Sequence, residues 1–268
     1  DGTFNEVLTG LLSHPSPGAT LPADMPVGII PAGTDGTLPK FITKTDPVQA
    51  AQVILRGHER RRMDVLKLTQ GSETRLSACG ASWGIPGQVA SDSEPYRDFF
   101  GVYRYAASTV KHFVNLKAVQ GSLIIQPAAP NLQPEGACGP HCKHCAQAAL
   151  QTPPQHRPEL VHLEGPFLIV GFTKTEKQVS PNAHLSDGCM DVFVIPSLSH
   201  LSLAELFIRV GAKAHMDDRR FQHWKATWVQ IAPANETDVF NVDGEVMEGG
   251  RTEVAVLPRA CSVLCAAW

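Results

Sequence analysis

The chain opens on a glycine turn that runs directly into an amphipathic helix. Asp1 and Gly2 come first, and apolar residues then follow at helical spacing, namely Phe4, Val7, Leu8 and Leu11. Further along, residues 27–30 form an apolar strand that ends in a second glycine loop around Gly33. A glycine turn at a helix N-terminus presents backbone N–H groups to phosphate. Two such loops in this order predict a nucleotide-binding site built on an α/β fold.

Composition excludes several classes of protein. The 268 residues are 43% hydrophobic and 18% charged, which is typical of a globular chain with one large domain or two moderate ones. The net charge of −3 argues against a basic nucleic-acid-binding surface. No apolar run is long enough to cross a bilayer, so we expect only peripheral membrane contact. Seven cysteines, an odd number, favour reduced thiols and a cytoplasmic location.

The pattern of apolar and polar residues changes near residue 62, which suggests a domain boundary there. We expect residues 1–62 to be the C-terminal part of an α/β domain. Residues 63–268 alternate apolar and polar side chains in short runs, which predicts a strand-rich domain. Two amphipathic helices are predicted within it, at 96–116 and 201–215. A segment rich in Pro, Gly and Cys, about 127–158, is predicted to be a loop insertion.

The two glycine motifs, DGTFNEV at 1–7 and GIIPAGT at 28–34, resemble the signature of the diacylglycerol, sphingosine and ceramide lipid kinase family. The resemblance implies an α/β nucleotide-binding domain, then a β-sandwich that holds the lipid, with the cleft between them. It also leads us to expect further strands and another nucleotide loop ahead of residue 1. The implied cofactors are ATP and Mg²⁺.

Phosphoryl transfer to an alcohol needs a carboxylate that orients the hydroxyl and accepts its proton. By the resemblance, Asp1 is this general base, and Gly2, Thr3 and Glu6 face the nucleotide. The alternative is a helix-capping turn without a ligand.

The second glycine loop departs from the usual family pattern. The resemblance assigns Gly33 and Thr34 to ATP, but the loop continues through residues 35–37 as Asp-Gly-Thr, without the usual Gly-Asn. This form is similar to the divergent ceramide kinase version. A plain strand-to-helix turn is the alternative. Because of this departure, a non-catalytic homologue that binds lipid is a further alternative for this chain.

Residues 83–104 resemble a third motif of the same lipid kinase family. By the resemblance, Arg97 and Arg104 reach the triphosphate, and their guanidinium groups suit phosphate oxygens. The alternative is a solvated helix face. Gln88 and Ala90 stand where sphingosine kinases are expected to carry an acidic residue for the lipid amine. The predicted lipid contacts are Trp83, Gln88, Phe99, Tyr103 and Phe207.

Two acidic segments complete the predicted ATP and metal sites. Asp187 and Asp191 match a turn that binds Mg²⁺ in bacterial relatives; otherwise they form a polar turn. Asp243, Gly244 and Glu245 match a family hairpin that faces the nucleotide. Asp-Gly is also a common hairpin turn. By the resemblance, either Asp1 or Asp243 is the base.

The cysteines Cys138, Cys142 and Cys145 are spaced C-x3-C-x2-C, with two histidines between them. This pattern fits either a structural zinc site or unligated thiols in a loop. Similar clusters occur in ceramide kinases. We therefore expect transfer of the γ-phosphate of Mg-ATP to the primary hydroxyl of ceramide, at a peripheral membrane surface. The alternatives are a sphingosine, long-chain-base or diacylglycerol kinase.

Overall fold

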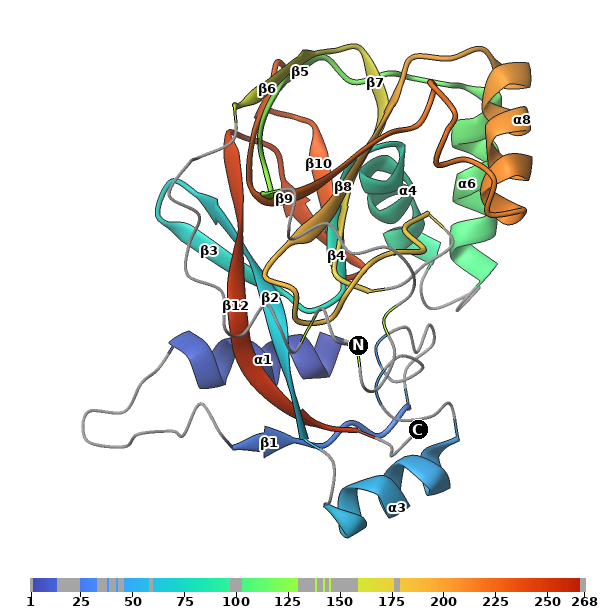
Figure 1. Cartoon of the computed structure of the whole chain (residues 1–268). Helices are drawn as coiled ribbons and strands as arrows, with labels where there is room; N and C mark the ends of the chain where they lie inside the picture. Colours follow the sequence, from blue (N-terminus) through green and yellow to red (C-terminus); the bar gives the residue numbers. More distant parts are fainter. Residues whose placement is uncertain are drawn as a thin grey trace.

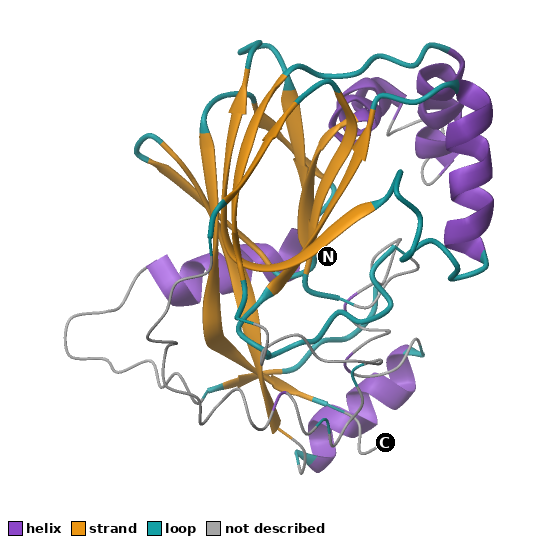
Figure 2. Cartoon of the chain, turned by 45° about the horizontal axis from the view of Figure 1, so that its top comes forward, coloured by secondary structure: helices purple, strands orange, loops and turns teal. Residues whose placement is uncertain are grey.

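The fold is known from a computed structural model, which describes residues 2–13, 25–32, 38, 42, 46–57, 60–96, 103–129, 138, 142, 145, 159–175 and 179–265. A curled, almost entirely antiparallel sheet dominates the described residues, and helices lie around its outside (Figures 1 and 2). Within them, no helix combines the length and the apolar character that crossing a bilayer requires.

The sheet follows one long path with two side branches. Its order is β11-β10-β4-β7-β8-β9-β12-β2-β3, with β5 between β9 and β6, and β1 beside β12. The only parallel pair among the described strands is β1 with β12. The strands are β1 (Pro26–Val27), β2 (Arg60–Gln70), β3 (Glu73–Ser77), β4 (Gly80–Gly84), β5 (Gly121–Pro127), β6 (Val161–Glu164), β7 (Phe167–Thr173), β8 (Met190–Pro196), β9 (Gln222–Pro233), β10 (Val239–Val242), β11 (Glu245–Glu248) and β12 (Thr252–Leu264).

Three apolar clusters pack against the sheet among the described residues, and the third joins α8 to β7 and β8. The largest one fills the inside of the curl; β7, with all seven residues buried, crosses it. A second cluster joins the N-terminal helix α1 (Gly2–Ser13) to the sheet, because Leu8 packs with Met63 and Val65 of β2. Burial of such side chains contributes about 1.5–3 kcal/mol each. The N-terminal segments are therefore fixed against the same sheet as the rest of the chain.

The remaining helices lie at the edges of the sheet. They are α3 (Pro47–Arg56), α4 (Ile85–Ser93), the 3₁₀ turn η1 (Glu94–Tyr96), α6 (Arg104–Val114) and α8 (His200–Gly211). Local capping explains two of them: the Asp46 side chain accepts from Gln49 N at 2.8 Å, and Ser199 caps α8 in the same way. The α6 and α8 helices lie side by side, where the His200 ring meets Phe113 and the Val114 carbonyl (Figure 1).

An α/β N-terminal part followed by a β-rich domain is the fold class expected from the sequence, and the structure confirms it. The predicted helix at 201–215 corresponds to α8. The predicted helix at 96–116 is confirmed only as α6, and residues 97–102 lie outside the described residues. Helix α4 was not predicted. The boundary near residue 62 and the insertion at 127–158 stay predictions.

Candidate functional site

The β10–β11 hairpin turns at Asp243 and Gly244, which both have positive φ angles of 51° and 92°. Gly adopts this conformation without strain, and Asp is among the few other residues that tolerate it. The Asn241 side chain fixes the turn by accepting from Gly244 N at 2.8 Å. The turn leaves Glu245 exposed at the start of β11.

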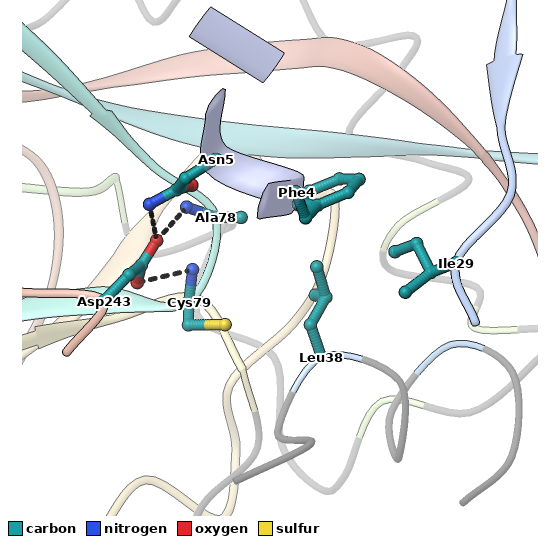
Figure 3. A pocket seen from close by; sticks show the side chains of 7 residues that line it. All are labelled: Phe4, Asn5, Ile29, Leu38, Ala78, Cys79 and Asp243. Carbon is teal, nitrogen blue, oxygen red and sulfur yellow. Dashed lines mark hydrogen bonds between the residues drawn. The ribbon is translucent and has the colours of Figure 1, made fainter. Parts of the chain in front are cut away.

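The Asp243 carboxylate accepts five hydrogen bonds from two parts of the chain, Asn5 of α1 and residues 77–80. The bonds from Asn5, Ala78 and Cys79 are drawn in Figure 3. Oδ1 accepts from the hydroxyl of Ser77 at 3.0 Å and from the backbone N–H groups of Cys79 and Gly80 at 3.1 and 2.9 Å. Oδ2 accepts from Ala78 N at 2.8 Å and from Asn5 Nδ2 at 2.6 Å. Both oxygens are therefore occupied by donors of the folded chain.

This arrangement joins the first helix to the hairpin. Asn5 lies one turn into α1, so its bond to Asp243 places the N-terminal end of α1 beside the β3–β4 turn and the β10–β11 hairpin. A small pocket, with space for about one water molecule, lies at this junction. Its lining residues are Phe4, Asn5, Ile29, Leu38, Ala78, Cys79 and Asp243 (Figure 3).

The other predicted nucleotide residues lie around this junction or outside the described residues. Gly2 begins α1, and Thr3 and Glu6 are exposed on it. Asp1, Gly33, Thr34 and Arg97 lie outside the described residues, as does the side chain of Arg104. The described part thus brings the α1 residues, Asp243, Gly244 and Glu245 into one region.

The predicted lipid contacts divide into core and surface. Trp83 is fully buried, stacks on Phe240 and donates from Nε1 to Asp238 Oδ2 at 3.1 Å, so the structure places it in the apolar core. Gln88 is half-buried on α4; its Oε1 is buried without a partner among the described residues. Tyr103 and Phe207 are 76% and 41% exposed. Phe99 lies outside the described residues.

Asp187 and Asp191, the predicted magnesium ligands, belong instead to a buried ionic cluster. The Lys174 ammonium contacts Asp187 Oδ1 at 2.8 Å, and that of Lys225 contacts Asp187 Oδ2 at 2.9 Å and Asp191 Oδ2 at 2.7 Å. The His223 ring contacts the remaining Asp191 oxygen at 2.8 Å. Protein groups already occupy every one of these carboxylate oxygens, which favours a structural role for both aspartates over a magnesium site.

Lys174 is the centre of this cluster. Its ammonium also contacts Asp64 Oδ2 at 2.9 Å and donates to the Cys189 carbonyl, and its side chain is fully buried. Burial opposes its charge, but Asp187 and Asp64 raise the pKa of Lys174 above its usual value. Burial likewise opposes ionisation of Asp187, yet Lys174 and Lys225 hold its pKa at about 2. The cluster is therefore a paired, ionised part of the core.

A second polar centre gathers the three cysteines. Cys138, Cys142 and Cys145 place their sulfur atoms, together with a ring nitrogen of His184, within 4.8 Å of one another. We call these four residues the Cys3His cluster. The sequence indicated the cysteines but not which fourth residue joins them. His184 stands in the motif that also contains Asp187, and only the fold brings it to the cysteines.

Two domain families match the chain. Residues 1–68 match the diacylglycerol kinase catalytic domain, and residues 170–265 match the YegS C-terminal NAD kinase beta sandwich-like domain. A solved structure titled as a putative diacylglycerol kinase from Bacillus anthracis shares the fold with a TM-score of 0.60. It is 16% identical and covers 90% of this chain and 70% of its own length.

Curated relatives extend over most of the chain. Sphingosine kinase 2 of Arabidopsis thaliana is 25% identical over 94% of this chain and 56% of its own length. Human ceramide kinase is 26% identical, and the match covers 94% of this chain and 52% of the kinase. Rat sphingosine kinase 1 is also 26% identical, and the match covers 92% of this chain and 69% of the kinase. The chain therefore spans little more than half the length of the first two relatives. Together, the two domain families and these relatives support a lipid kinase family for this chain, without distinguishing ceramide from sphingosine as the substrate.

Proposed function

We propose that the protein is an ATP-dependent lipid kinase that transfers the γ-phosphate of Mg-ATP to the primary hydroxyl of ceramide. The observation that carries the proposal is the junction at Asp243. It holds the helix that follows Asp1 against the hairpin of Gly244 and Glu245. Two motifs some 240 residues apart in sequence thereby meet at one place, as a shared ATP site requires.

In this proposal the two aspartates have different roles. Asp1 is the general base that accepts the proton of the lipid hydroxyl as the new bond to phosphorus forms. Asp243 is a positioning residue, because its two oxygens already accept from five donors of the chain. A carboxylate so occupied is poorly placed to take a further proton from a substrate.

Residues near the junction suit the cofactors. Mg²⁺ takes oxygen ligands, and the exposed side chains of Thr3, Glu6 and Glu245 offer them. When bound, Mg²⁺ would neutralise charge that develops on the phosphate oxygens. We also assign Gly2, Gly33, Thr34, Arg97 and Arg104 to ATP, on the motifs that the sequence carries.

Two residues of α4 favour an N-acylated lipid over a lipid with a free amine. A charged amine would need a carboxylate as its partner, but Gln88 carries a neutral amide and Ala90 is a buried apolar residue. The buried Oε1 of Gln88, unpartnered among the described residues, is an acceptor suited to an amide N–H. Ceramide has that N–H, whereas sphingosine has an ammonium group.

We further propose that the protein acts in the cytoplasm at a membrane surface. Large apolar side chains are exposed on the neighbouring helices α6 and α8, including Val110, Val114, Leu201 and Ile208. Such residues favour contact with lipid over contact with water. Tyr103 and Phe207, on or beside the same helices, are the corresponding candidates for lipid contact.

The substrate proposal predicts a specificity change in Gln88→Asp. We expect the full-length protein to phosphorylate ceramide in preference to sphingosine and diacylglycerol. Gln88→Asp should shift the ratio of kcat/KM toward sphingosine by about tenfold or more, because a carboxylate pairs with the charged amine of sphingosine, whereas the amide of ceramide carries no charge. Labelled-phosphate transfer to the three lipids in matched micelles measures this ratio.

Gln120→Asp, an exposed position with the same chemical change, is the matched control and should leave the ratio unchanged. A wild-type preference for sphingosine would assign the substrate to the alternative branch of the family. ATP binding without transfer to any lipid would favour the non-catalytic homologue.

A further inference from the structure

The Cys3His cluster has the dimensions of a tetrahedral metal site. Cys138 Sγ lies 3.7 Å from Cys145 Sγ, and His184 Nδ1 lies 3.2 Å from Cys142 Sγ and 3.8 Å from Cys145 Sγ. Zinc binds sulfur at about 2.3 Å and nitrogen at about 2.0 Å, so a regular tetrahedron has edges of about 3.6–3.8 Å. These three separations are close to such edges, and every pair of ligand atoms lies within 4.8 Å. The four atoms are therefore near enough to share one ion.

Hydrogen-bond donors lie around two of the sulfur atoms of the cluster. Arg61 Nη2 donates to Cys138 Sγ at 3.7 Å, and the Leu185 backbone also hydrogen-bonds this sulfur. The Ser186 backbone and hydroxyl hydrogen-bond Cys145. Donors of this kind stabilise a thiolate sulfur. Thiolate is the form of cysteine that binds metal.

We propose that the Cys3His cluster binds one structural zinc ion. Three sulfur ligands and one imidazole nitrogen are a common zinc set, and soft sulfur ligands select zinc over magnesium or calcium. Four protein ligands leave no position for water or substrate, so the ion has a structural role. A structural ion at this place is compatible with any of the candidate lipid substrates.

The ion would connect the cysteine segment to the connection between β7 and β8. His184 is followed by Leu185, whose carbonyl accepts from Asp64 N of β2 at 2.9 Å. The Arg259 side chain of β12 donates to the Cys145 carbonyl at 3.3 Å. Leu185 and Cys138 also pack in the apolar cluster that holds α1. Zinc would thus fix a segment beside the ionic cluster and the α1 junction.

A disulfide between Cys138 and Cys145 is the alternative use of these thiols. Their sulfur separation of 3.7 Å exceeds the bond length of about 2.05 Å, and none of the seven cysteines, all of which the structure describes, forms a disulfide. A disulfide would remove two of the four ligands. The two chemistries are therefore mutually exclusive, and one experiment distinguishes them.

The test is zinc content of the purified protein by elemental mass spectrometry, after purification without chelator. We expect about one zinc per chain in the wild type. Cys142→Ala should retain less than about a tenth of this amount, because three ligands hold structural zinc far more weakly than four. Cys261→Ala makes the same change at a buried cysteine outside the cluster and should retain all the zinc.

A second measurement uses only the wild-type chain, in case Cys142→Ala fails to fold. Cobalt(II) exchanged into the protein should give the visible and sulfur-to-metal absorption bands of a tetrahedral site with thiolate ligands. A zinc content below about a tenth per chain after reconstitution, with no such bands, would overturn the proposal. A Cys138–Cys145 disulfide found by peptide mass spectrometry would overturn it equally.

Discussion

Replacing Lys174 with methionine should lower the free energy of unfolding by about 3–5 kcal/mol, because the change leaves the buried Asp64 carboxylate without its cation and Asp187 with Lys225 alone. Lys174 contacts Asp64 and Asp187 at 2.9 and 2.8 Å, and the side chains of these acids are 0% and 2% exposed. Methionine fills a similar volume, so lost packing adds little to this effect. Urea denaturation of the two proteins measures the difference.

Lys117→Met is the matched control for this change. Lys117 is exposed, so its replacement should change the free energy of unfolding by less than about 0.5 kcal/mol. A Lys174→Met protein within about 1 kcal/mol of the wild type would contradict the ionic cluster. The same result would reopen Asp187 as a metal ligand.

The stability of the protein at acid pH also depends on this ionic cluster. The pKa of Asp187 is about 2 in the folded chain, below the value of about 3.9 in an unfolded one. Its contribution to stability is therefore complete above about pH 4 and is lost as the pH falls toward 2. The measurement is the free energy of unfolding of each protein at pH 5 and at about pH 3. The decrease between the two pH values should be smaller in Asp187→Asn than in the wild type.

Asp243→Asn should lower stability by about 2–4 kcal/mol and lower phosphoryl transfer with it. Asparagine tolerates the positive φ of 51°, so the backbone effect is small. Its amide has one acceptor oxygen where the carboxylate has two, and its NH₂ group would face N–H donors of residues 78–80. At least one buried donor then loses its partner. Thermal denaturation and transfer rate on the same preparations measure both effects.

Two further variants separate positioning from proton transfer at Asp243. Asn5→Ala removes only the bond to α1, so it should cost about 1 kcal/mol of stability and still lower the transfer rate. Asp217→Asn, at an exposed aspartate, should change neither quantity. If Asp243→Asn abolished transfer at unchanged stability, Asp243 would be the base and its proposed role would be wrong.

Local patterns predicted much of this fold. The alternation in β2 and β3 and the continuous apolar run in β7 are period-two and fully buried strand signals. Helix α4 gave no such signal, because Pro86 and Gly87 stand in its first turn and its buried positions are small residues.

The roles of polar residues depended on partners distant in sequence. The turn at Asp187 suggests a metal site locally, but the lysines that neutralise it come from β9 and from the residue after β7. Asp243 looks like a hairpin residue until Asn5, 238 positions away, is placed beside it. His184 joins cysteines about 40 residues upstream for the same reason. Spacing along the chain carries no information on such pairs.

Transfer of the γ-phosphate from labelled ATP to ceramide is the decisive measurement of the proposed activity, with wild type and Asp1→Asn compared at equal ATP binding and equal thermal stability. We predict ceramide 1-phosphate from the wild type and a rate lower by a factor of about 10²–10⁴ in Asp1→Asn, as expected for loss of a general base. An Asp1→Asn protein that transfers phosphate at the wild-type rate, or a wild type that binds ATP and phosphorylates no lipid, would contradict the account.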